Sequence, residues 1–208
     1  MAAEGDRPAG FAGCRGLLLM GGRSARFGRD KAWIEWEREP LWRRQVRLLA
    51  TRVDEVWRAL PYGSPAGPDD LVDPVPYPGP WWAIRAALAR LDPAAPWLAV
   101  LAVDLPGVPV ALLDRLWAAR IPGGVALSAA GAVRQPLAAV WHRGVLDATE
   151  DVPSEGIPLG RVLERVPCRA VVLSGDEVEW LHNVNTPRDW ERWAERGRRP
   201  AEARDRDG

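Results

Sequence analysis

A glycine-rich, basic loop from Gly21 to Lys31 contains the residue types that could most directly do chemistry. Glycines let the backbone approach a ligand closely and let successive N–H groups point at an anion. Four cations in this loop stand against Asp30 alone, and they are Arg23, Arg26, Arg29 and Lys31. The loop therefore suits a phosphate chain. Composition alone equally allows a solvated basic loop with no ligand.

The spacing of the glycines excludes two well-known phosphate loops. A Walker A loop has four residues between its glycines, followed by Lys and then Ser or Thr. Here five residues separate Gly22 from Gly28, and Arg29 follows. The G-x-G-x-x-G dinucleotide fingerprint is also absent from the loop.

Two apolar runs predict the strands that would position this chemistry. The run Gly16–Met20 ends at the glycine loop and predicts a buried strand. The run Trp97–Val103 is continuously apolar, which is typical of a parallel-sheet strand buried on both faces, and it ends at Asp104. Gly21, Gly22 and Asp104 thus fall just past the ends of two strands.

The remaining pattern alternates strands with helices and predicts one α/β domain with a mostly parallel, doubly wound sheet. In such sheets a ligand lies beyond the carboxyl ends of the strands. We expect the domain over 15–196, an N-terminal extension over 1–14 and a disordered tail over 197–208. Expected helices are Pro40–Ala50, Trp82–Leu91, Pro109–Ala119, Ile157–Val166 and Pro187–Ala194, and further strands are Val53–Leu60, Leu71–Val72, Val125–Ser128, Leu137–Trp141 and Ala170–Leu173.

Composition excludes several classes of protein. With 28 basic and 28 acidic residues the formal net charge is zero, which argues against nucleic-acid binding by bulk charge. Cys14 and Cys168 are the only cysteines, too few for a disulfide framework or a structural zinc site, and they fit a reducing cytoplasm. We expect both cysteines, and also His142 and His182, to be structural. No apolar run approaches the roughly 18 residues of a membrane span, so no membrane contact is expected.

The glycine loop resembles a specific family motif. The segment Leu19–Ala32 is similar to the L-A-G-G-x-S-x-R-M-G-x-D-K-A motif of the molybdenum cofactor guanylyltransferases, the MobA type. Met20 replaces the usual Ala and Phe27 the usual Met. The Asp30–Lys31 pair separates this group from most other sugar and alditol nucleotidyltransferases.

Further segments resemble the family in the same order along the chain. Pro40-Leu41 with Gln45 continues the glycine-loop pattern, and Asp73 precedes a Tyr77-Pro78-Gly79-Pro80 segment. Val103-Asp104-Leu105-Pro106 resembles the family's C-D-x-P. Arg134–Trp141 resembles its H-P-L-x-A-L-Y strand. Asn183–Asp189 resembles N-x-N-T-P-x-D/E, so the resemblance covers residues 15 to about 195.

The resemblance implies a Rossmann-like, three-layer nucleotidyltransferase fold and a role for particular residues in catalysis. Nucleotidyl transfer depends on positioning and charge neutralisation more than on acid–base groups. Mg²⁺ prefers one or two carboxylates and keeps several waters, so Asp104 is expected to be its ligand. Lys31 and Arg26 would neutralise the triphosphate and the charge that develops on pyrophosphate.

It also implies binding residues for two substrates. Nucleotide contacts are expected from Leu19, Met20 and Gly21 through backbone groups, with Gly22, Lys31, Asp73 and Asp104. Arg161, Asn183 and Asn185 are expected on the pterin side. The alternative for Asn183 and Asn185 is a capping role, because Asn favours helix starts and Thr186-Pro187 opens a helix.

Two departures from the family pattern concern the nucleobase. Ala59 stands where the family often has an Asn, so no amide is present there. Trp81 and Trp82 replace a Leu and a small Ala, and their bulk could narrow the base pocket or stack on a base. These changes bear on base selectivity more than on phosphate handling.

The resemblance therefore predicts transfer of GMP from GTP to the molybdopterin-bound molybdenum cofactor, with Mg²⁺ and release of pyrophosphate. GTP and molybdopterin are the expected partners, beside proteins that deliver the cofactor or molybdoenzymes that receive it. One alternative is a cytidylyltransferase for the same cofactor or a nucleotidyltransferase for another phosphate. A second is a catalytically weak paralogue that binds nucleotide or carries cofactor, and a third is a structural α/β protein.

Overall fold

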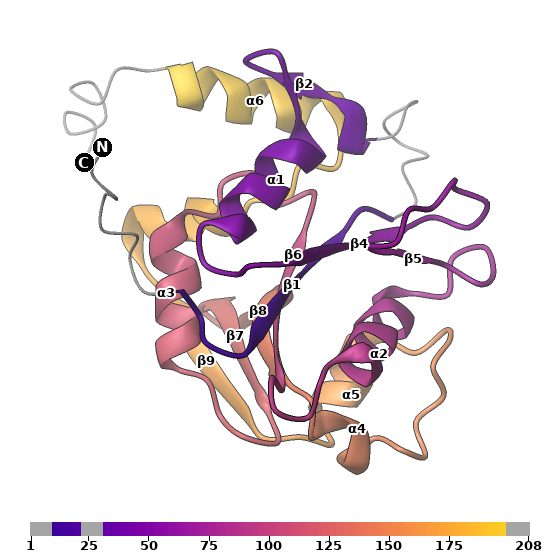
Figure 1. Ribbon diagram of the computed structural model, residues 1–208. Coiled ribbons are helices and arrows are strands. Elements are labelled where there is room, and N and C mark those ends of the chain that lie inside the picture. Colours follow the sequence, from indigo (N-terminus) through magenta and orange to yellow (C-terminus); the bar gives the residue numbers. More distant parts are fainter. Residues whose placement is uncertain (1–9, 22–30, 199–208) are drawn as a thin grey trace, which may run out of the picture.

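A computed structural model describes residues 10–21 and 31–198 of the chain. A seven-stranded sheet forms its centre, in the order β5-β4-β1-β6-β8-β7-β9 (Figure 1). The strands are β1 (Cys14–Leu19), β4 (Val56–Leu60), β5 (Asp70–Val72), β6 (Trp97–Ala102), β7 (Val125–Ala130), β8 (Val133–His142) and β9 (Cys168–Leu173). Strand β8 is antiparallel to both its neighbours, and the other paired strands run parallel. The predicted mostly parallel sheet is confirmed.

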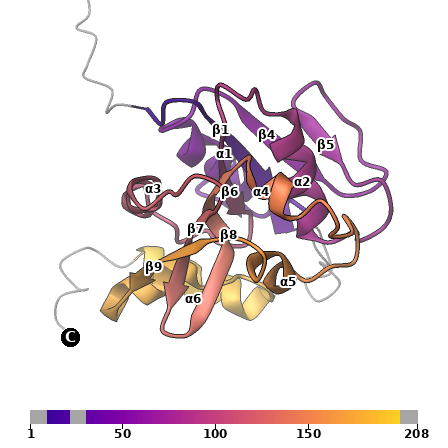
Figure 2. The ribbon, with the colours of Figure 1, turned by 90° about the horizontal axis from the view of Figure 1, so that it is seen from below.

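Helices cover both faces of this sheet, which makes the expected three layers (Figures 1 and 2). Helices α1 (Leu41–Ala50), α3 (Val110–Ala118) and α6 (Pro187–Arg198) lie on one face. Helices α2 (Pro80–Arg90), α4 (Val145–Ala148) and α5 (Leu159–Leu163) lie on the other. The layers exist because each helix buries one apolar stripe against the sheet.

Strand β6 is buried along its length, as its continuous apolar sequence predicts. Leu98 through Val103 are each at most 5% exposed. Burial on both faces follows from its place between β1 and β8, with helices above and below. The buried strand therefore fixes the position at which the chain leaves the sheet at Asp104.

Trp81, at the start of α2, is part of the hydrophobic core. It is fully buried, and its ring centroid lies 6.1 Å from that of Trp141 on β8. Trp81 is therefore not exposed for stacking on a nucleobase. Trp82 is partly buried and packs against the same core.

A short hairpin connects the glycine-loop region to α1. It follows a 3-10 turn, η2 (Lys31–Trp33), and pairs β2 (Glu35–Trp36) with β3 (Glu39–Pro40). Trp36 contacts Trp190 and Trp193 of α6 at centroid distances of 5.9 and 5.0 Å. Beside it, Ile34 and Val184 form a second small core with these two tryptophans. The hairpin is thereby packed on α6.

Some local expectations need correction. The helix expected over Ile157–Val166 is the shorter α5, because Pro158 sets its start and Pro167 precedes β9. The hairpin, α4 and the 3-10 helix η3 (Gly175–Leu181) were not expected. Near the ends of the described chain, Phe11 is buried and stacks on Trp117 at 4.7 Å, and α6 continues to Arg198. Within the described residues, no helix is long and apolar enough to cross a membrane.

Candidate nucleotide-transfer site

Three of the residues singled out in the sequence follow parallel strands at the same edge of the sheet. Gly21 comes two residues after β1, Asp73 directly after β5 and Asp104 two residues after β6. Since β5, β4, β1 and β6 are consecutive parallel neighbours, their carboxyl ends meet at this edge. The edge is where an α/β sheet of this kind binds its ligand.

Asp73 lies against the backbone of the glycine loop. A methyl group placed on Gly21 would sit 3.5 Å from Asp73 Oδ2, and the Asp73 N–H donates to the Leu60 carbonyl at 2.9 Å. Desolvation by burial raises the pKa of the Asp73 carboxyl to about 6. The absence of a side chain at Gly21 thus leaves room beside a carboxylate that titrates near neutral pH.

The end of β1 uses part of its backbone within the sheet. The Leu19 carbonyl accepts from the Val103 N–H, and the Met20 N–H donates to the Ala59 carbonyl, both at 3.0 Å. The Met20 N–H is therefore unavailable to a nucleotide. Ala59 itself is buried at 3% exposure, and no amide occupies this position.

The turn that carries Asp104 is held by two distant segments. The Val184 N–H donates to the Asp104 carbonyl at 2.9 Å. Gln45 of α1 is completely buried, and its Nε2 donates to the Leu105 carbonyl at 2.7 Å. The Asp104 side chain remains partly exposed at the edge of the sheet. The fold thus fixes the backbone of Asp104 at this edge of the sheet.

Asn183 and Asn185 flank Val184, so the structure brings both asparagines to the Asp104 turn. Both are exposed, and Asn183 Oδ1 accepts from Gln135 Nε2 at 3.2 Å. Neither asparagine takes the N-cap position of α6. Thr186 does, because its Oγ1 accepts from the Asp189 N–H at 3.2 Å while Asp189 Oδ2 accepts from the Thr186 N–H at 2.9 Å.

Arg161 lies on α5, on the opposite face of the sheet from α6. Its guanidinium pairs with Glu164 at 3.4 Å on an exposed surface, a contact worth little in stability. Within the described residues no hydrogen bond joins Arg161 to Asn183. Its helix begins close to Gly79, since the Gly156 N–H donates to the Pro78 carbonyl at 2.8 Å. Arg161 is therefore at the α2 side of the edge.

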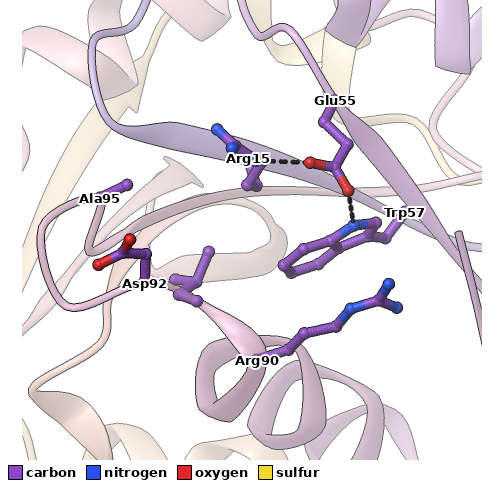
Figure 3. A pocket seen from close by; sticks show the side chains of 7 residues that line it. Arg15, Glu55, Trp57, Arg90, Asp92 and Ala95 are labelled. Carbon is purple, nitrogen blue, oxygen red and sulfur yellow. Dashed lines mark hydrogen bonds and ion pairs between the residues drawn. The ribbon is translucent and has the colours of Figure 1, made fainter.

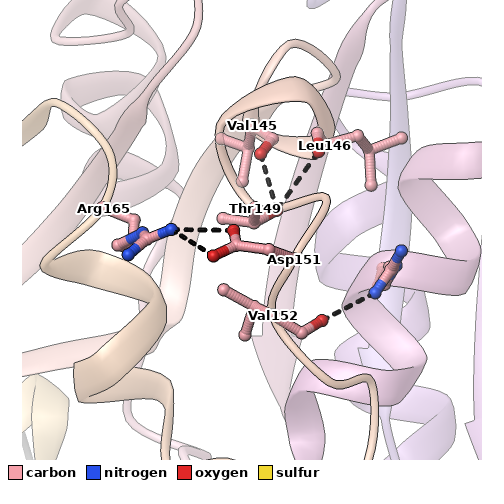
Figure 4. A network of polar contacts seen from close by, with 7 residues as sticks. Val145, Leu146, Thr149, Asp151, Val152 and Arg165 are labelled. Carbon is pink, nitrogen blue, oxygen red and sulfur yellow. Dashed lines mark hydrogen bonds and ion pairs between the residues drawn. The ribbon is translucent and has the colours of Figure 1, made fainter.

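Polar contacts hold the segment that leads into α5 (Figure 4). Thr149 is buried, and its Oγ1 donates to the Val145 carbonyl at 2.7 Å. Arg165 pairs with both oxygens of Asp151 at 2.7 and 2.6 Å. Arg85 of α2 donates to the Val152 carbonyl at 2.8 Å. These contacts attach the segment to α2 and fix where α5, the helix that carries Arg161, begins.

Two expected site residues, Gly22 and Arg26, lie outside the described residues. Lys31 starts η2, whose next residue, Ala32, is completely buried. The backbone of Lys31 is thus anchored next to the core.

A separate small cavity of about 190 Å³ lies at the opposite, amino edge of the sheet (Figure 3). Its polar groups already have partners within the protein. Arg15 pairs with Glu55 at 2.8 Å, Glu55 also accepts from Trp57 Nε1, and the Arg90 guanidinium lies 4.8 Å from the Trp57 ring centroid. None of the expected site residues lines it. The cavity is separate from the candidate site.

The expected structural roles of the histidines and cysteines fit their surroundings where the structure shows contacts. His142 Nδ1 accepts from the Gly144 N–H at 2.9 Å, and desolvation by burial lowers the pKa of its imidazole. Burial raises the pKa of the Cys14 thiol to about 12, which makes it unreactive.

Sequence reasoning missed Gln45 and Gln135 as residues of this site. A signal was present, because the whole chain contains only two glutamines and two asparagines. All four belong to the motif segments that meet at the Asp104 turn.

Comparison with known proteins places this geometry among nucleotidyltransferases. The sequence model of the "MobA-like NTP transferase domain" matches residues 16–176. The chain is 33% identical over 186 residues to the molybdenum cofactor guanylyltransferase of Pseudomonas paraeruginosa, covering 84% of this chain and 91% of that protein. It is 32% identical over 195 residues to that of Pseudomonas putida, covering 86% and 97%.

Solved structures with lower sequence identity share the fold. Molybdopterin-guanine dinucleotide biosynthesis protein A from Archaeoglobus fulgidus aligns with a TM-score of 0.69 at 19% identity, covering 88% of this chain and 98% of that one. Rv0371C from Mycobacterium tuberculosis, in complex with manganese, aligns with a TM-score of 0.62 at 18% identity, with the same coverage.

Proposed function

The chain belongs to the MobA-like NTP transferase family and is a nucleotidyltransferase. We propose that it transfers the GMP moiety of GTP to the molybdopterin-bound molybdenum cofactor. An oxygen of the acceptor's phosphate attacks the α-phosphorus of GTP. The bond from that phosphorus to the bridging oxygen breaks, pyrophosphate leaves, and a new phosphoanhydride gives molybdopterin guanine dinucleotide. The observation that carries the proposal is the hydrogen bond from Val184 to Asp104, which joins the expected pterin segment to the expected metal ligand.

The residues present at the edge fit a magnesium ion that arrives with the nucleotide. Asp104 supplies one partly exposed carboxylate at the end of a buried strand. In the described part of the chain no cluster of three or more metal-ligating side chains occurs. Mg²⁺ at nucleotide sites is commonly bound by one or two carboxylates together with substrate phosphates, so Asp104 can serve. When bound, the ion would neutralise phosphate charge.

The nucleotide side of the site is built from the end of β1 and the residue after β5. Gly21 and Gly22 would let the loop backbone approach the phosphates. Lys31 and Arg26 would neutralise the triphosphate and the departing pyrophosphate. Leu19 and Met20 would contact the nucleotide through backbone groups other than the bonded Met20 N–H. The ionised Asp73 carboxylate can accept hydrogen bonds from the guanine edge.

The acceptor side lies next to Asp104. Asn183 and Asn185 would bind the pterin substrate through their exposed amides. Arg161 would contact the same substrate from α5 on the other side of the edge. We also propose a cytoplasmic location, and contacts with the proteins that deliver the cofactor or receive the product.

Calorimetry with GTP, CTP, ATP and UTP, with and without Mg²⁺, tests the nucleotide assignment. We expect magnesium-dependent binding with preference for GTP, followed by formation of the guanine dinucleotide from molybdopterin. Preference for CTP would move the assignment to a cytidylyltransferase. Failure to bind any of the four would contradict an active enzyme and favour a paralogue without activity.

A further inference from the structure

The four side-chain amides of this chain gather around the turn that follows β6. Gln45 donates to the Leu105 carbonyl, and Gln135 donates to Asn183. Asn183 and Asn185 flank Val184, whose N–H donates to the Asp104 carbonyl. An amide carries both donors and acceptors, so its orientation decides what it offers to a ligand.

The orientation of two of these amides is set by the backbone of β8. The Leu137 N–H donates to Gln135 Oε1 at 3.4 Å. A backbone N–H can only donate, so this contact assigns the oxygen of Gln135 and leaves Nε2 on the other side. Gln135 Nε2 then donates to Asn183 Oδ1 at 3.2 Å. The donors therefore run in one direction along this chain of hydrogen bonds, from Leu137 to Gln135 and from Gln135 to Asn183.

Asn183 is left as a donor at an exposed position. Its Oδ1 faces Gln135, so its Nδ2 group points away from Gln135. Within residues 10–21 and 31–198, Nδ2 donates to no protein group. The adjacent residue, Val184, is bonded to the carbonyl of Asp104. A ligand beside Asp104 therefore meets N–H groups at Asn183.

We propose that Gln135 is a positioning residue that fixes Asn183 as a hydrogen-bond donor to an oxygen atom of the acceptor substrate. This inference rests on the proposed function. Carbonyl oxygens of a pterin and oxygens of a phosphate are both acceptors, whereas a ligand group that can only donate would find no partner.

Gln135→Glu tests the polarity with a side chain of the same shape. A carboxylate only accepts, so it would draw Asn183 Nδ2 to itself and turn Oδ1 towards the ligand. We expect the KM for molybdopterin to rise about tenfold or more. The hydrogen bond from Asn183 to the substrate oxygen would be replaced by two acceptors that face each other. The Kd for GTP with Mg²⁺ should not change. Gln135 is only partly buried and Asn183 is exposed, so the variant should fold.

A double-mutant cycle separates positioning from a general disturbance of β8. In an Asn183→Ala background, Gln135→Glu should have no further effect on the KM for molybdopterin, because Gln135 acts through Asn183. Val133→Thr is a matched control on the same strand, 72% exposed and without an amide, and should behave as wild type. Equal effects of Gln135→Glu in both backgrounds would overturn the positioning role.

Two inhibitors identify the acceptor oxygen. Unphosphorylated pterin and inorganic phosphate are measured as competitors of molybdopterin, and the one whose inhibition weakens in Gln135→Glu carries the oxygen bound by Asn183. An unchanged KM with both inhibitions unchanged would overturn the inference while wild-type turnover upholds the proposed function. A wild-type protein that forms no dinucleotide would overturn the proposed function itself.

Discussion

The Val184 N–H donates to the carbonyl oxygen of Asp104 at 2.9 Å, across 80 residues of sequence. Val184 is 1% exposed and packs against Ile34, three residues after Lys31. One small residue thus connects the segment after the glycine loop, the expected metal ligand and the two asparagines. Backbone and core contacts therefore bring these parts of the site together.

Asp104→Asn should leave the fold intact and reduce turnover on the order of 10²-fold or more. The contact with Val184 uses the backbone carbonyl of Asp104, so the substitution keeps it. The negative charge that would be offered to a metal ion is lost. Steady-state kinetics and circular dichroism of the two proteins check this. Full activity in Asp104→Asn would remove the carboxylate from the mechanism.

The pKa of Asp73, raised to about 6 by desolvation, predicts a pH dependence of GTP binding. The ionised form accepts hydrogen bonds from guanine, so wild-type affinity should fall as the pH drops through 6. In Asp73→Asn this step should be absent, and calorimetry from pH 5 to 8 with the same ligand makes the comparison.

The same shift has an opposite consequence for folding stability. Because the folded-state pKa lies above the ordinary value of 3.8, the stabilising effect of Asp73 is complete below about pH 4 and is lost as the pH rises through 6. Identical pH profiles of the wild type and Asp73→Asn would contradict both statements.

Gln45→Met should weaken the magnesium response without a large loss of stability. The buried Gln45 Oε1 has no hydrogen-bond partner among the described residues, so removing the amide removes one unsatisfied group while it frees the Leu105 carbonyl. The Asp104 turn then loses one of its two remote ties. We expect about tenfold more Mg²⁺ for half-maximal GTP binding, measured by calorimetry. Leu49→Met, on the same buried face of α1, is the control and should respond like wild type.

Lys31 is the only lysine in the sequence, which permits a direct test of its role. Reductive methylation with ¹³C-formaldehyde labels Lys31 and the amino terminus, and Lys31→Arg assigns the signals. Addition of GTP with Mg²⁺ should shift the Lys31 resonance, because its ammonium would meet the triphosphate. GTP binding with no shift at Lys31 would exclude this contact.

The turn of the β2–β3 hairpin offers a stability prediction independent of function. Glu37 and Arg38 adopt φ values of 52° and 66° in a two-residue loop, a geometry that favours Asn-Gly. The double substitution Glu37→Asn, Arg38→Gly should stabilise the protein by about 1–2 kcal/mol. Urea unfolding measures the gain, with Glu37→Ala, Arg38→Ala as the control expected to give none. A lower midpoint for the Asn-Gly variant would show that these side chains stabilise the turn.

Most of the architecture could be predicted because its central strands are apolar runs and glycine and proline separate the elements. Strands β1 and β6 and helices α1, α2 and α3 lie within a few residues of their predicted ranges. The hairpin could not be predicted, since Glu37-Arg38 carries no turn signal and Trp36 is held by contacts with the distant α6. Helix α5 is shorter than predicted because Pro158 sets its start and Pro167 precedes β9.

The sequence by itself determined the family, the order of the motifs and the identity of Asp73, Asp104, Asn183 and Asn185 as candidates, because residue types and their spacing are local properties of the chain. The tertiary structure alone decided that Trp81 belongs to the core and that Thr186, not an asparagine, caps α6. It also brought Gln135 within hydrogen-bond distance of Asn183. Burial and hydrogen-bond polarity depend on which distant segments meet, and only the folded sheet brings those segments together.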